Sequence, residues 1–148
     1  MNNVLNGSFY NGLNCGLNTQ PIKGDYYHNG IHMRSRAELI VAEVLDELKL
    51  QYKYEPAIEI NGTYYYPDFI VYIEEINCCI IIEVLGMTDN YEYLTNSIFK
   101  ISKYSELGIH INKNLLLIAG SASYFPDTED IYNSIVTMVN LAVLRALI

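Results

Sequence analysis

The chain has 148 residues, of which 51% are hydrophobic, and a formal net charge of −8, so it is long enough for one domain with a buried core. The acidic surplus argues against a protein that coats nucleic acid non-specifically, because such binding needs many basic side chains facing phosphates. The odd number of cysteines argues against a disulfide framework, and neither a secretory leader nor an apolar run of ~18 residues is visible, so we expect a cytoplasmic protein without a membrane segment.

Residues 1–22 are rich in asparagine and glycine and show no helical or strand period. This composition favours a flexible N-terminal arm, with an ordered strand or a partner-binding segment as the alternative. Residues 23–148 are predicted to form a single domain.

The first regular elements are a hairpin and a helix. Residues 27–32 turn at Asn29-Gly30, a pair that favours two-residue hairpin loops. Ser35 is a suitable N-cap, and Glu38 completes a capping-box pattern three residues later. The apolar spacing that follows predicts a helix from Arg36 to about Leu48 with one face against a sheet.

Several strands are predicted next. Residues 52–55 alternate like a strand, and residues 57–66 read as a hairpin around Asn61-Gly62. Residues 68–73 and 78–84 form a second antiparallel pair. Because residues 78–84 are apolar at successive positions, this strand is predicted to be central in its sheet.

The last part of the chain predicts a helix over residues 90–107 ended by Gly108, a buried strand over 115–118, and a helix from Thr128 onward capped by Asp127. The final turn of that helix is apolar enough to suggest a buried or a self-associating face, and we expect a homodimer through it. The order of elements predicts an α/β fold with one central mixed β-sheet flanked by helices.

Two carboxylates stand at the ends of apolar strands. Asp68 follows Pro67 directly before an apolar run, and Glu83 ends the run of isoleucines at residues 80–82. A carboxylate loses hydration as it approaches a core, so something must compensate the charge. A divalent cation bound by oxygen ligands would do so and would also activate water.

With Glu38, Asp68 and Glu83 in this order, the chain resembles the PD-(D/E)XK nuclease superfamily over roughly residues 27–120. The resemblance implies a restriction-endonuclease-like core. It assigns Glu38 as the acid of the first helix, Asp68 as the aspartate of the Pro-Asp pair, and Glu83 as the strand glutamate.

The chain departs from the family pattern at Leu85, where the pattern has lysine. Residues 83–86 read Glu-Val-Leu-Gly, which is similar to branches of the superfamily that carry the lysine on the following helix. Lys100 fits that displaced lysine, with Lys103 as the second choice. Helical spacing places Tyr104 on the same face as Lys100.

The resemblance implies hydrolysis of phosphodiester bonds in DNA by a metal-dependent endonuclease. Mg²⁺, or Mn²⁺ as a substitute, would be held by Asp68, Glu83, the carbonyl of Val84 and Glu38, while Lys100 would orient the attacking water or neutralise the developing charge.

Further cationic and hydroxyl groups are candidates for binding the substrate. Arg34 and Arg36 stand at a helix N-terminus, where positive charge is unfavourable unless something outside the helix, such as phosphate, benefits from it. Exposed surface charge is the alternative. Lys103 and Tyr104 complete the substrate-binding set. Since little of the chain is left for a recognition domain, a larger protein partner is a further expectation.

Each assignment has a structural alternative. Asp68 after a proline can be a turn residue, Glu38 can be only a cap, and Lys100 can be a solvated lysine. A catalytically inactive member of the same fold, binding nucleic acid or a protein partner, is therefore the main rival, because leucine at residue 85 cannot replace lysine. A protein that acts only through interactions is the third possibility.

Overall fold

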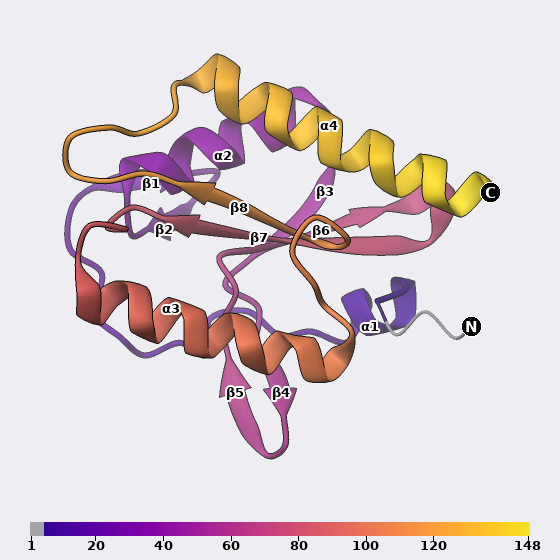
Figure 1. Ribbon diagram of the computed structural model, residues 1–148, viewed down its shortest axis with the longest axis horizontal. Coiled ribbons are helices and arrows are strands. Elements are labelled where there is room, and N and C mark those ends of the chain that lie inside the picture. Colours follow the sequence, from indigo (N-terminus) through magenta and orange to yellow (C-terminus); the bar gives the residue numbers. More distant parts are fainter. Residues whose placement is uncertain (1–4) are drawn as a thin grey trace.

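The structure is a computed structural model and describes residues 5–148. Its centre is a four-stranded sheet in the order β3 (Gln51–Tyr54), β6 (Phe69–Ile73), β7 (Cys78–Leu85) and β8 (Leu115–Ala119) (Figure 1). β3, β6 and β7 are antiparallel neighbours, whereas β8 lies parallel to β7. This arrangement confirms the predicted mixed sheet and the central position of β7.

Helices cover both faces of the sheet. α2 (Arg36–Glu47) and α4 (Thr128–Leu147) pack on one face, and α3 (Tyr91–Tyr104) together with the short α1 (Gly7–Asn11) packs on the other (Figure 1). Because side chains alternate along β6, Phe69 and Val71 enter the first core and Ile70 enters the second. The coarse α/β architecture expected from the sequence is therefore present.

Two small hairpins lie outside the main sheet. β1 (Tyr26–His28) pairs with β2 (Ile31–Met33), and β4 (Ile58–Ile60) pairs with β5 (Thr63–Tyr65). Both turn residues of each hairpin have positive φ, as the Asn-Gly pairs predict. In Figure 1 the β4–β5 hairpin projects beyond α3.

Helix caps follow the predicted signals. The side chains of Ser35 and Asp127 accept hydrogen bonds from the backbone N–H groups of Glu38 and Asp130. A 3₁₀ turn over Ser105–Leu107 continues α3, and Gly108 follows it with φ of +77°. These confirmed ends fix where α2 and α4 begin and where α3 ends relative to the sheet.

The N-terminal segment differs from the expected flexible arm. Within it, Leu5 and Tyr10 are buried, and the N–H of Cys79 donates to the carbonyl of Leu5. The ammonium of Lys53 donates to the carbonyls of Tyr10 and Leu13 at 2.6 and 2.9 Å. Residues 5–13 are therefore packed on the sheet, and residues 1–4 lie outside the described part of the chain.

No helix within residues 5–148 is both long and apolar enough to cross a membrane. α4 is the longest helix, and its last two turns leave several apolar side chains exposed, namely Leu141, Leu144 and Leu147.

Candidate functional site

A cavity of about 600 Å³ opens where β7 ends, between the start of α2 and the middle of α3. All four sequence-predicted catalytic residues line it. They are Glu38, Asp68, Glu83 and Lys100. Residues from two helices, a strand and a loop thus converge on one hollow, as the sequence pattern predicted.

Asp68 lies in the bend that enters β6. Its Oδ2 accepts a hydrogen bond from the N–H of Val84 at 2.6 Å, which joins this bend to the end of β7. Asp68 is half-buried, with the cavity as its route to solvent. Burial raises the pKa of its carboxyl, and the nearby charge of Glu38 raises it further.

Glu83 is the most enclosed carboxylate of the site, with 3% of its surface exposed. The hydroxyl of Tyr104 donates to Oε1 at 2.6 Å, and the ammonium of Lys100 lies 3.1 Å from Oε1 and 3.2 Å from Oε2. Burial raises the pKa of Glu83 to about 8, with a further contribution from the charge of Asp68.

Lys100 comes from α3 and reaches across to the bend before β6, where its ammonium donates to the carbonyl of Tyr66 at 2.6 Å. Burial lowers the pKa of Lys100, but the charges of Glu83 and Asp68 together outweigh this effect and raise it. The amine therefore stays protonated. Leu85 lines the same cavity.

Glu38 is buried in the first turn of α2. Its carboxylate accepts hydrogen bonds from the hydroxyls of Ser35 at 2.8 Å and Tyr54 at 3.1 Å. Burial raises its pKa despite these bonds. Glu38 is thus both a cap residue and a wall of the cavity, so the structural and functional interpretations of the sequence are compatible.

Glu55 belongs to the site but was not among the residues selected from the sequence. It is 8% exposed, its N–H donates to the carbonyl of Asp68, and Nε of Arg34 lies 2.6 Å from Oε2. The available signal was its position at the end of β3, directly before Pro56, because β3 is the antiparallel neighbour of the strand that Asp68 enters.

Among residues 5–148, the carboxylates close enough together to hold a divalent cation differ from the expected set. Glu38, Glu55 and Asp68 each offer a carboxylate oxygen within 4.8 Å of the others. Both oxygens of Glu83 are engaged by Lys100 or Tyr104, and the carbonyl of Val84 accepts from the hydroxyl of Tyr93 at 3.4 Å. Three converging carboxylates offer the oxygen ligands that a hard cation such as Mg²⁺ prefers.

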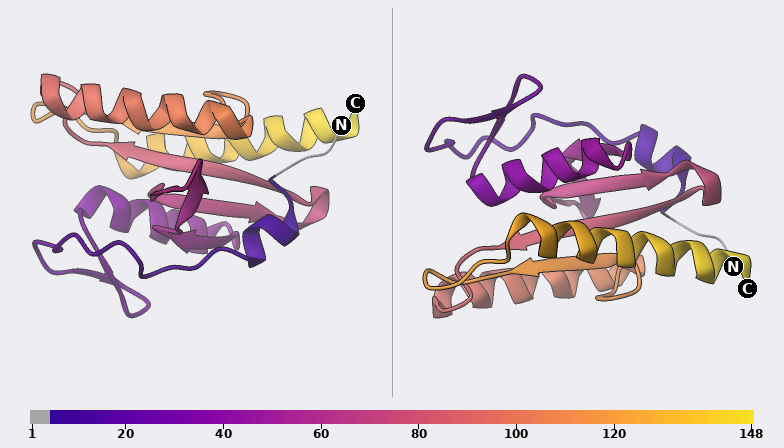
Figure 2. Two further views of the ribbon diagram at one scale, coloured as in Figure 1. Left: turned by 90° about the horizontal axis from the view of Figure 1, so that it is seen from below. Right: turned by 90° about the horizontal axis from the view of Figure 1, so that it is seen from above.

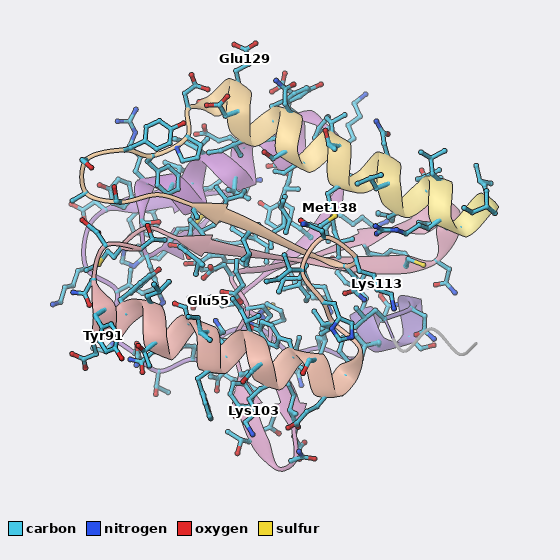
Figure 3. The ribbon with its side chains drawn as sticks, viewed as in Figure 1. Glu55, Tyr91, Lys103, Lys113, Glu129 and Met138 are labelled. Atoms are coloured by element: carbon cyan, nitrogen blue, oxygen red, sulfur yellow. The ribbon has the colours of Figure 1, made fainter. Side chains whose placement is uncertain are left out.

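The predicted substrate-binding residues are only partly gathered. Arg34 lines the cavity, whereas Arg36 is exposed at the start of α2 and does not. Lys103 pairs with Glu106 at 3.5 Å and points away from the sheet (Figure 3). Tyr104 is fully buried, so it supports Glu83 from inside the protein and cannot contact a substrate as expected.

The chain matches no family model, no curated protein and no solved structure at a significant level. The geometry of the site and the order of the elements are thus the basis for a functional interpretation.

Proposed function

We propose that this protein is a metal-dependent nuclease that hydrolyses phosphodiester bonds in DNA, with a restriction-endonuclease-like core of the PD-(D/E)XK type. The observation that carries the proposal is the meeting of Asp68, Glu83, Lys100 and Glu38 around one cavity at the end of β7. The order helix, three antiparallel strands, helix and parallel strand supports the same fold type.

Within this proposal the carboxylates of Glu38, Glu55 and Asp68 hold a divalent cation. A bound Mg²⁺ or Mn²⁺ would lower the pKa of a water molecule and offset charge on the phosphate. Glu83 acts mainly through Lys100, because the ion pair keeps the ammonium directed into the cavity. From there Lys100 can donate a hydrogen bond to a phosphate oxygen or to the attacking water.

A catalytically inactive protein that binds nucleic acid or a protein partner is the second candidate. The observation that favours it is the pairing of both cations in the cavity, Arg34 with Glu55 and Lys100 with Glu83, together with Leu85 in place of lysine. In this case the ion pairs would serve the fold and leave no cation free for a phosphate.

The proposal includes a homodimer formed through α4, which the exposed leucines of its last turns support. A larger protein partner that supplies sequence specificity remains part of the proposal as well.

Incubation of supercoiled plasmid with the protein and Mg²⁺ or Mn²⁺ tests the proposal. We expect relaxed and linear products from the wild type, and a loss of at least roughly 100-fold for Glu83→Ala and Lys100→Ala. Lys103→Ala is the matched comparison on the same helix and should retain cutting. Absence of cutting by the wild type on both DNA and RNA would favour the inactive binding protein. Loss of cutting in Lys103→Ala but not in Lys100→Ala would assign the catalytic amine to Lys103.

A further inference from the structure

One wall of the cavity is apolar. Met87 from the loop after β7, Tyr93 from the first turn of α3 and Phe125 from the loop before α4 line it together with the carboxylates. Met87 is 48% exposed, although it lies in a hollow and not on a flat surface. Aromatic rings and the polarisable thioether of methionine are suited to stacking on a planar ring.

The N-terminal segment supplies two amides to the same cavity. Asn18 and Gln20 line it, and the side-chain oxygen of Asn18 accepts from the N–H of Gln20 at 3.2 Å. Within residues 5–148 no hydrogen bond engages the side-chain amide of Gln20. In Figure 2 this segment and α3 lie on opposite sides of the molecule. A free amide can read the edge of a nucleobase, since it offers both a donor and an acceptor.

The protein has few unpaired cationic side chains that could bind the phosphates of a DNA duplex. Five of the nine lysines and arginines are engaged by carboxylates or carbonyls, namely Arg34, Lys53, Lys100, Lys103 and Arg145. The other four do not line the cavity. Because binding to duplex DNA rests largely on cations that neutralise phosphates, this surface is poorly suited to a fully paired substrate.

We propose that the cavity binds a single unpaired nucleotide, so that the substrate is DNA with an unpaired strand. Met87 and Phe125 would contact one side of the base, and the amide of Gln20 would contact the other side. This inference rests on the proposed nuclease function and narrows its substrate class. A cavity of about 600 Å³ has the size of a small-molecule site, and a base must leave the duplex stack to enter it.

Binding is measured first, with Ca²⁺ in place of Mg²⁺, by titrating the protein into a single-stranded oligonucleotide that carries 2-aminopurine. Stacking on the protein should quench the fluorescence of the label. A duplex that carries the same label should bind the protein at least roughly tenfold more weakly than the single strand. Met87→Ala and Gln20→Ala should each weaken binding to the single strand roughly fivefold to tenfold. Ile98→Ala is the control, because Ile98 is exposed on α3 outside the cavity.

Cutting is then compared in Mg²⁺ on a paired duplex and on the same duplex with an unpaired loop. Preference for the loop supports the inference, while equal binding and cutting of the paired duplex overturn it and leave the nuclease function intact. Binding to single strands without any cutting supports the nucleotide site and counts against the enzyme. Absence of quenching, or equal quenching by Met87→Ala, Gln20→Ala and the wild type, overturns the inference.

Discussion

Glu55 combines an unfavourable backbone conformation with a role in the site. Its φ is +47°, in the left-handed region, although the residue before a proline normally favours an extended backbone. Such a conformation costs on the order of 1 kcal/mol and persists only where the surroundings impose it. Here its N–H bonds to the carbonyl of Asp68 and its carboxylate bonds to Arg34, so the strain directs the carboxylate toward Asp68.

Glu55→Gln tests whether this carboxylate binds the cation. The substitution keeps the shape but removes the charge, so we expect the affinity for Mg²⁺ or Mn²⁺ to fall at least roughly tenfold. The rise in melting temperature caused by the metal should shrink accordingly, measured by thermal unfolding with and without metal. Arg34 also loses a charged partner, so the comparison uses the increment caused by metal and not the melting temperature itself.

Glu59→Gln is the matched control for this test. Glu59 lies on β4, is exposed and does not line the cavity. An unchanged metal increment in Glu55→Gln, together with the same increment in Glu59→Gln, would exclude Glu55 from the metal ligands.

At the scale of elements, α1 is held on the sheet by a half-buried lysine. Lys53 on β3 donates to two carbonyls near the end of α1, and its ammonium lies 4.7 Å from the centre of the Tyr10 ring. Hydrogen bonds of a charged donor contribute about 1.5–3 kcal/mol each when the partner would otherwise lack a bond. Lys53 therefore fixes the end of α1 to the main sheet. Further along the segment, the N–H of Ala57 and the guanidinium of Arg34 donate to the carbonyls of Asn14 and Pro21.

Lys53→Met should loosen the N-terminal segment. The methionine keeps the apolar stem but cannot donate, so we expect roughly 2 kcal/mol lower stability in urea unfolding and faster trypsin cleavage after the exposed Lys23. Lys49→Met is the control, because no side-chain hydrogen bond of Lys49 reaches α1. Equal cleavage rates at Lys23 in the two variants would show that Lys53 does not hold the segment.

The sequence predicted best the elements that local chemistry determines. Both Asn-Gly hairpins, the Ser35 and Asp127 caps and the buried β7 follow from signals within a few residues, and all were confirmed. α1 was missed because its five residues are stabilised by contacts with β6 and β7, which no local pattern contains.

The same division applies to the site. Asp68 and Glu83 stand out because carboxylates interrupt apolar runs, whereas Glu55 lies in a mixed segment and joins them only through the pairing of β3 with β6. Arg36 and Lys103 were selected by type and spacing, and their exposed directions depend on how α2 and α3 pack.

At the scale of the whole molecule, the cavity gathers several carboxyl groups in an already acidic protein. Glu38, Asp68 and Glu83 all have raised pKa values, for which burial is the largest cause. In the absence of metal the folded protein therefore holds protons that the unfolded chain releases, since an unfolded glutamate titrates near ~4.3.

This difference gives stability a definite dependence on pH. Between about 4.3 and about 8, the pKa of folded Glu83, the folded state binds more protons, so its stability falls as pH rises through this window. In EDTA we expect the free energy of unfolding in urea to be on the order of 2 kcal/mol lower at pH 8 than at pH 6. Glu83→Gln should flatten this slope, which separates the site from the general repulsion caused by the net charge. An equally steep slope in Glu83→Gln would place its origin elsewhere.

Metal should oppose this trend. A cation binds deprotonated carboxylates, so its affinity rises with pH, and a ligand at 100 times its dissociation constant stabilises the folded state by about 2.7 kcal/mol. In millimolar Mg²⁺ or Mn²⁺ the fall in stability between pH 6 and pH 8 should therefore shrink or reverse, measured by the same urea unfolding. Without metal, the carboxyl groups of the cavity should lower the stability of the folded protein as they ionise. A bound cation should restore that stability, as expected for a functional site. If saturating metal leaves both the stability and its slope with pH unchanged, the carboxylates of Glu38, Glu55 and Asp68 do not form a metal centre and the nuclease proposal loses its chemistry.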